Sequence, residues 1–158
     1  MADHRGAARW FAAGSTQRAY TARMLRHVWS VLCNQVFVDP ETNSVALAVV
    51  ESRELGPSAE PTPSAARGPF DLVTLWYSDV GTVAFSYKVK VTGPSGRVLA
   101  DTDVAGPEFH PPVLRTRTRL RFPALPHDGP GVYWFCTMRL VDGQEVLDAE
   151  VPLELNGA

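Results

Sequence analysis

The chain has 158 residues, of which 45% are hydrophobic and 20% are charged, and its formal net charge is −2. A chain of this length buries enough apolar surface for one self-sufficient domain, and its composition excludes global disorder. Because the net charge is close to zero, the molecule has no overall field that would attract nucleic acid or an anionic membrane, so any such contact must be local.

The expected compartment follows from segments that the sequence lacks. No apolar run reaches the ~18 residues that a membrane span needs, and the first residues do not show the basic and then apolar pattern of a secretory signal. We therefore expect a cytoplasmic protein with no membrane span. The two cysteines, Cys33 and Cys136, have no metal-ligand spacing and are expected to be free thiols, with a disulfide between two sheets as the alternative.

Residues 1–26 differ in composition from the rest of the chain. They contain five arginines and one acid, Asp3, with small and aromatic residues between them. Ser15 has the chemistry of a helix N-cap, and the residues after it recur at spacings of three and four. We predict an N-terminal helix or flexible arm, with a cleaved targeting segment as the alternative. Trp10 and Phe11 are a candidate apolar anchor for a partner protein, although packing on the domain's own sheet would also explain them.

From residue 27 to residue 156 apolar residues tend to alternate with polar ones, which is the pattern of half-buried strands. The alternation is clearest at residues 83–91, where lysines occupy the polar face. Residues 72–78 are apolar on both faces and predict a central strand. A mobile loop rich in Pro, Ser and Ala is expected at residues 55–69. The other predicted strands are residues 28–38, 45–53, 98–104, 114–122, 132–141 and 145–155.

The number and spacing of these strands predict the fold class. Seven or eight short strands, with a closing hairpin at Asp142-Gly143, favour an all-β antiparallel sandwich of two sheets over residues 27–156, with a barrel as the alternative. Trp29, Trp76 and Trp134 fall on predicted strands and are expected in the core.

One motif sharpens this prediction. The run "GVYWF" at residues 131–135 resembles the tyrosine corner of immunoglobulin-like domains, in which the hydroxyl of the corner residue, here Tyr133, bonds back to a neighbouring loop. Phe135 stands where that family places a disulfide cysteine. Together with "TGPSGRVL" and "GVYWFCTMRLVDGQEV", the chain is similar to a family of uncharacterised bacterial immunoglobulin-like sandwich proteins. The resemblance implies the fold and no activity.

A row of arginines occupies every second position of one predicted strand and spans about 20 Å on a single face. A solvated strand that resists edge aggregation explains the row, and an acidic protein partner would explain it too. The outward acids of the last strand are Asp148, Glu150 and Glu154. In an immunoglobulin-like strand order they lie on the opposite sheet, which would give the molecule one basic and one acidic face. The row consists of Arg115, Arg117, Arg119 and Arg121.

The sequence carries no motif for catalysis or for metal binding. The histidines are scattered, no nucleophile elbow occurs, and no glycine-rich loop precedes a helix. We therefore expect no enzyme activity, no cofactor and no metal.

These observations predict a non-enzymatic protein-interaction or assembly subunit, one that docks on a larger protein complex through a charged sheet face. The alternative is an electrostatic binder of nucleic acid or anionic lipid, and a homo-oligomer is left open. Nucleic acid is disfavoured because the arginines have no aromatic residues interleaved on their own face for base stacking, and because the pI is about 6.1. The candidate contact residues are Arg115, Arg117, Arg119, Arg121, Trp10 and Phe11.

Overall fold

The computed structural model describes residues 25–42, 44–54, 66–79, 85–106, 109, 114–126, 128–141 and 143–157. The helix or arm predicted over residues 1–26, with its candidate anchor Trp10 and Phe11, lies outside the described residues except for its last two positions. Those two positions belong to a strand, which begins at Leu25.

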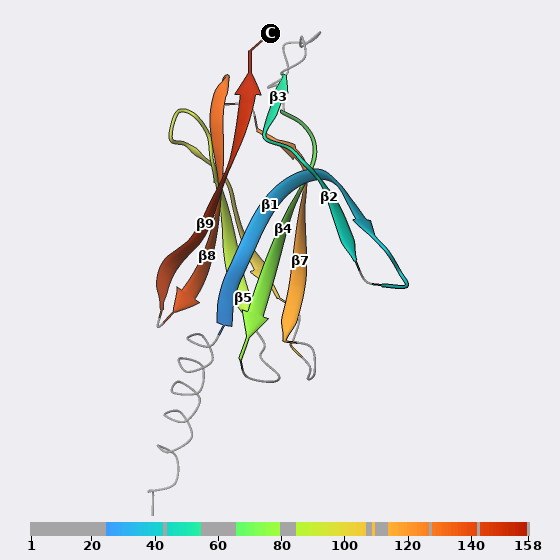
Figure 1. The fold of residues 1–158 in the computed structure, drawn as a ribbon. Coiled ribbons are helices and arrows are strands. Elements are labelled where there is room, and N and C mark those ends of the chain that lie inside the picture. The colour runs from blue at the N-terminus through green and yellow to red at the C-terminus, as the bar shows by residue number, and fades with distance from the viewer. Residues whose placement is uncertain are drawn as a thin grey trace, which may run out of the picture.

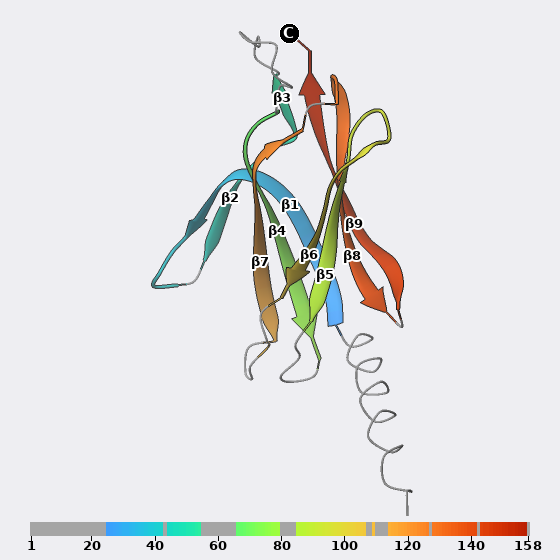
Figure 2. The same cartoon turned by 180° about the vertical axis from the view of Figure 1, so that it is seen from behind.

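The described residues form two β-sheets that face each other, and they include no helix (Figures 1 and 2). The first sheet is antiparallel and has four strands in the order β2-β1-β4-β7. The second has five strands in the order β3-β9-β8-β5-β6 and is antiparallel except for β3, which runs parallel to β9. The four-stranded sheet contains β1 (Leu25–Val38), β2 (Val45–Val49), β4 (Ala66–Ser78) and β7 (Arg115–Leu125). The five-stranded sheet contains β3 (Ser52–Glu54), β5 (Ser86–Thr92), β6 (Val98–Ala105), β8 (Gly131–Val141) and β9 (Gln144–Asn156).

The prediction of an all-β sandwich is confirmed at this level, and its details differ in two ways. The described residues form nine strands instead of seven or eight, because the run predicted at residues 45–53 divides into β2 and the short β3, which pair with different sheets. The loop predicted at residues 55–69 ends earlier than expected, since β4 already begins at Ala66.

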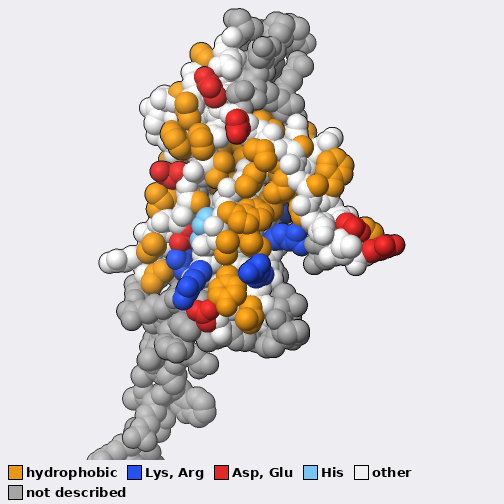
Figure 3. Space-filling model, viewed as in Figure 1, with side chains coloured by type: hydrophobic (Ala, Val, Ile, Leu, Met, Phe, Trp, Pro, Cys, Tyr) orange, Lys and Arg blue, Asp and Glu red, His pale blue; other side chains and the backbone are white. Residues whose placement is uncertain are grey.

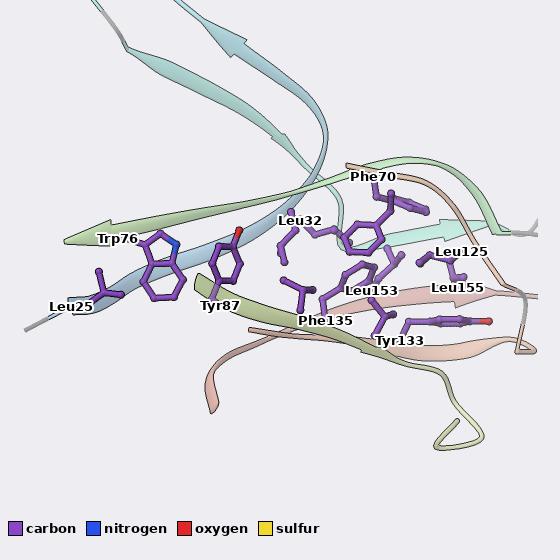
Figure 4. Packing of buried hydrophobic residues seen from close by; sticks show 14 of the residues in the cluster. Leu25, Leu32, Phe70, Trp76, Tyr87, Leu125, Tyr133, Phe135, Leu153 and Leu155 are labelled. Carbon is purple, nitrogen blue, oxygen red and sulfur yellow. The ribbon is translucent and has the colours of Figure 1, made fainter. Parts of the chain in front are cut away.

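The core lies between the two sheets and follows from the alternation along the strands. In β5, Tyr87, Val89 and Val91 are at most 2% exposed, while the lysines between them point to the other face. Figure 4 shows Trp76 of β4 beside Tyr87 of β5, which belongs to the facing sheet. Full burial of side chains of this size contributes about 1.5–3 kcal/mol each, so this double layer supplies most of the driving force for folding.

The hydroxyl of Thr118 on β7 is a polar centre within the core. It accepts hydrogen bonds from Trp76 Nε1 at 3.3 Å and from the Tyr87 hydroxyl at 2.7 Å. Burial raises the pKa of Tyr87, so this hydroxyl stays protonated and acts as a donor. These bonds satisfy polar atoms that would otherwise be buried without partners.

Two of the three tryptophans predicted in the core lie elsewhere. Trp76 is fully buried, as expected. Trp134 is 41% exposed, because it alternates with the buried Tyr133 and Phe135 and so points away from the core. Trp29 is half-buried and pairs with Leu75, whose neighbours Thr74 and Trp76 point inward, so it lies on the outer face of the four-stranded sheet.

The tyrosine motif has the local geometry that its resemblance implies. The Tyr133 hydroxyl donates to the Gly129 carbonyl at 2.8 Å and accepts from the Asp128 amide at 2.9 Å. The Asp128 carboxylate also accepts from the Ser95 amide and hydroxyl, at 3.0 and 2.6 Å. This aspartate therefore joins the turn between β5 and β6 to the loop before β8.

Strand β1 is shared between the sandwich and a projecting hairpin. Its first part pairs with β4, and its second part pairs with β2 beyond a β-bulge between Cys33 and Gln35. A bulge bends its strand, and the β1–β2 hairpin accordingly leaves the body of the sandwich (Figures 1 and 2).

Candidate functional site

The arginine row lies on the outer face of the four-stranded sheet, at one edge. Thr118 and Phe122 of the same strand are buried, and the arginines alternate with them, so the arginines point outward as predicted. Among the described strands, β7 pairs only with β4, and β4 in turn pairs with β1. The arginines therefore share their face with the outward side chains of β4 and β1.

The register of the three strands places aromatic and basic side chains in rows across this face. One row contains Arg26, Tyr77 and Arg115, so that a tyrosine lies between two arginines. The next row contains Trp29, Leu75 and Arg117. Figure 3 shows apolar side chains over β1 and β4, with blue Lys and Arg side chains beside them. We call this surface the arginine-aromatic face, consisting of Arg26, Trp29, Leu75, Tyr77, Arg115, Arg117, Arg119 and Arg121.

The sequence prediction missed the aromatic part of this face. Trp29 was expected in the core, and Tyr77 lies on a strand that is apolar on both sides, so alternation does not distinguish its faces. Only the pairing of β4 with β1 and β7 brings these rings beside the arginines. The argument that the arginines lack aromatic neighbours is therefore wrong for the folded chain.

Arg119 has a different environment from the other members of its row. Its Nη2 donates to Asp71 Oδ2 at 2.7 Å, and the Asp71 side chain is only 1% exposed. The hydrogen bond to this carboxylate raises the pKa of Arg119. The second Asp71 oxygen is buried without a hydrogen-bond partner among the described residues. Arg119 is thus committed to neutralising a buried acid of its own sheet.

The ends of the row differ from Arg119. Arg115 and Arg121 are exposed and have no ion pair within the described part of the chain. Arg117 is half-buried and makes contacts of its own. Arg26, across the face, pairs with Asp79 at 3.1 Å, but its side chain is 68% exposed, so water screens this pair.

The five-stranded sheet presents a different outer surface, in which charges are paired. Lys88 contacts Glu145 at 3.0 Å and Asp101 at 3.5 Å, and Lys90 contacts Glu145 at 3.6 Å. The hydrogen bond to Glu145 raises the pKa of Lys88, and the same bond lowers the pKa of Glu145. Acids outnumber the lysines here, because Asp103, Glu150 and Glu154 are also exposed on this surface.

The predicted separation of the charged stripes is confirmed in part. The arginine row on β7 and the acids of β9 do lie in different sheets. However, Asp148 is held by Arg139 through two hydrogen bonds, at 2.6 and 2.7 Å, and is 7% exposed. Glu150 and Glu154 are exposed, so β9 presents two of the three outward acids that the sequence predicts.

A recess of about 550 Å³ lies where the start of β1 meets the β8–β9 hairpin. Arg139 crosses it and donates to the Leu25 carbonyl as well as to Asp148. His27 lines the recess, with Nε2 at 2.8 Å from Ser30 Oγ and its ring edge against Trp76. Burial lowers the pKa of His27. These contacts join the two sheets at their open edge, so we assign the recess a structural role.

The cysteines are free, as predicted. Cys33 is buried on the four-stranded sheet, and burial raises its pKa above the usual value, as it does for Cys136. In the described ranges, no group of three or more His, Cys, Asp or Glu residues is placed to hold a metal ion. The same ranges include no helix that is long and apolar enough to cross a membrane.

Comparison with family models gives no match for this chain, and comparison with curated proteins gives none either. Among solved structures the chain is similar to the alkylpurine DNA glycosylase AlkC of Pseudomonas fluorescens, bound to DNA that contains an abasic site analogue. The TM-score is 0.40 at 13% identity, and the alignment covers 92% of this chain but 36% of the other. The chain thus spans well under half of that protein, and the likeness transfers no activity to it.

The predicted function, a non-enzymatic assembly subunit that docks through a charged sheet face, is wrong. The solved structure to which the chain is similar is a DNA glycosylase bound to DNA. Within the chain, the charge pattern on which that prediction rested is also incomplete, since Arg119 is bound to Asp71 and Asp148 to Arg139.

Proposed function

We propose that this protein binds single-stranded nucleic acid on its arginine-aromatic face. The observation that carries the proposal is the row in which Tyr77 lies between Arg26 and Arg115 on one side of the sheet. Sequence-tolerant binders of single strands combine a basic surface that follows the backbone with aromatic rings on which the bases stack. The arginine-aromatic face contains both components.

The arginines have the spacing and chemistry for a phosphate backbone. They recur at every second residue of a strand, or about 6.8 Å, and so form a line of positive charge. A guanidinium binds phosphate through two parallel hydrogen bonds, which lysine cannot do. Arg115 and Arg121 are the exposed members without an ion pair in the described chain, so we assign them the phosphate contacts.

Trp29 and Tyr77 favour a single strand over a duplex. In a duplex the faces of the bases are covered by their neighbours, and only base edges and phosphates can be reached. In a single strand the bases can leave the stack and lie on an aromatic side chain. Both rings are partly exposed on the sheet surface, which is the arrangement that stacking requires.

A pair of double variants tests the phosphate contacts. R115S/R121S and K88S/K90S each remove two positive charges and so change the net charge equally, from −2 to −4. We expect R115S/R121S to lose about tenfold or more in affinity for a labelled single-stranded oligonucleotide, measured by fluorescence anisotropy, because two phosphate contacts are removed. The lysine variant should bind like the wild type, because its lysines lie on the other sheet, beside Glu145. Equal losses in both variants would show a general charge effect and no site.

A second pair tests stacking. Trp29→Ala should weaken binding by about 1–3 kcal/mol, the usual contribution of one stacked base. Trp134→Ala removes a tryptophan that is 41% exposed on the other sheet and serves as the control. Loss of binding in the control and not in the first variant would place the site on the five-stranded sheet.

A further inference from the structure

We propose that two copies of this chain associate through the free edge of β2, which pairs with itself in a two-fold antiparallel arrangement. This inference goes beyond the proposed function and does not depend on it. Strand β2 is the last strand of its sheet, and no described residue forms a strand on its other side. An unpaired edge of this kind is a template for another strand.

The backbone of β2 presents alternate residues to this edge. The Ser44 carbonyl, just before the strand, accepts from the Asp39 amide, and the Val50 amide, just after it, donates to the Leu32 carbonyl. Both bonds point toward β1. Because successive residues of a strand direct their backbone groups to opposite sides, the odd-numbered residues of β2 direct theirs away from β1. These residues are Val45, Leu47 and Val49.

The sequence of β2 is self-complementary. It reads Val-Ala-Leu-Ala-Val, which is the same in both directions. In a two-fold antiparallel pair centred on Leu47, that leucine lies opposite Leu47 of the second copy, and Val45 lies opposite Val49 of the second copy. All three are residues whose backbone groups point outward, so every such pair is a hydrogen-bonded one. The side chains that meet across the axis are also of matched size.

The edge lacks the features that protect natural edges. Strand β2 contains no lysine, no proline and no charged residue, although these are the usual guards against pairing. Large apolar side chains on the hairpin are open to water, since Phe37, Val38 and Val49 are 56–57% exposed. Pairing would extend the sheet and cover part of this apolar surface.

The position of the hairpin turn relative to the second copy follows from the same arrangement. The hairpin turn is acidic, with Asp39 and Glu41 exposed. Antiparallel pairing directs the turn of one copy toward the base of the hairpin of the other copy. There Val49 pairs with Cys33, Cys33 with Asp71, and Asp71 with Arg121. Arg121 lies three strands away from the β2 edge, so the matched sequence of β2, and not charge, is what favours a second copy over an unrelated partner.

Sedimentation of the full chain over a range of concentrations tests the pairing, with two variants as a matched pair. Leu47→Lys places like charges opposite each other at the axis and should convert the dimer to a monomer. Val98→Lys adds the same charge at an exposed valine of β6, which is the edge strand of the other sheet, and should leave the dimer intact. A wild type that is monomeric at all concentrations, a dimer that survives Leu47→Lys, or large irregular assemblies would each overturn the proposal.

Cross-linking tests the register without relying on a destabilising change. In a Cys136→Ser background, Leu47→Cys should form a disulfide-linked dimer under mild oxidation, because facing residues of a hydrogen-bonded pair have Cα atoms about 5.5 Å apart, within disulfide range. Ala46→Cys faces residue 48 of the second copy and should cross-link poorly. Equal cross-linking at residues 46 and 47 would contradict the proposed register.

Discussion

Arg119 and Arg121 are two residues apart on the same face of one strand, yet their environments assign them different roles. Arg119 neutralises the buried carboxylate of Asp71, whereas Arg121 is exposed. We expect Arg119→Ser to lower the free energy of unfolding by about 2–3 kcal/mol, because it leaves a buried acid without its charged partner. Arg121→Ser should change it by less than about 0.5 kcal/mol.

Urea denaturation of both variants checks this difference. Adding Asp71→Asn to Arg119→Ser should restore part of the loss, because the unpaired charge is then removed. Equal destabilisation by the two arginine variants would show that the ion pair contributes nothing specific.

At the scale of single residues, the sequence predicts toward which face of a strand a side chain points but not which residue it contacts. Period-two spacing correctly predicted that the four arginines point outward. It could not predict that Asp71 binds Arg119, because the two residues are 48 positions apart and no local pattern links them. For the same reason it did not place Trp29 and Tyr77 on the arginine face.

Contacts between particular residues join one element to another, and the alternating pattern along the strands does not reveal them. Gly93, in the turn between β5 and β6, has no room for a side chain, because a Cβ atom there would lie 2.3 Å from Asp128 Oδ2. Gly93→Ala should therefore destabilise the protein by about 1–3 kcal/mol through overpacking. It should also separate this turn from the loop before β8.

Gly157→Ala is the matched control for thermal unfolding. A Cβ atom at Gly157 would lie 3.6 Å from Pro130, which is an ordinary contact, so little change is expected. A Gly93→Ala variant as stable as this control would show that Asp128 moves freely and that the two connections are not locked together.

Most of the strands were predictable from their apolar patterns, although β4 begins at Ala66 instead of residue 72 and β3 was not distinguished from β2. Their register was not. The bulge at Cys33 and the division of residues 45–53 between two sheets depend on which strands meet, and strand pairing is a property of distant segments. The β2 edge, which carries the proposed dimer, became visible only with that pairing.

The whole molecule should show a pH-dependent stability that arises from His27. Burial lowers the pKa of His27, Arg139 lowers it further, and Asp148 and the Trp29 backbone oppose the shift. Below a pH of about 6.5 the unfolded chain binds a proton that the folded chain does not, so stability is full above that pH and falls as the pH decreases toward the folded pKa.

Unfolding in urea at several pH values between about 5 and 8, the range in which histidine titrates, measures this effect. His27→Gln should flatten the decrease relative to the wild type. The other three histidines lie outside the described residues, and their contributions are shared by both proteins. Parallel curves for the two proteins would contradict the role assigned to His27.

At the scale of the molecule, the sequence predicted two packed sheets, and the structure confirms them. The charge distribution could be predicted only in part, because ion pairs within the five-stranded sheet hold Asp148 and the two lysines that the sequence presents as free. What remains is a basic face that also carries aromatic rings, and this combination is the basis of the proposed function.

The most direct test of that function compares one oligonucleotide as a single strand and as a duplex, by anisotropy with the wild-type chain at low and moderate salt. We expect preferential binding of the single strand, with an affinity that falls with salt by a slope of about 0.7 per phosphate contacted. Preference for the duplex, or no binding to either form at low salt, would contradict the assignment of the arginine-aromatic face to single-stranded nucleic acid.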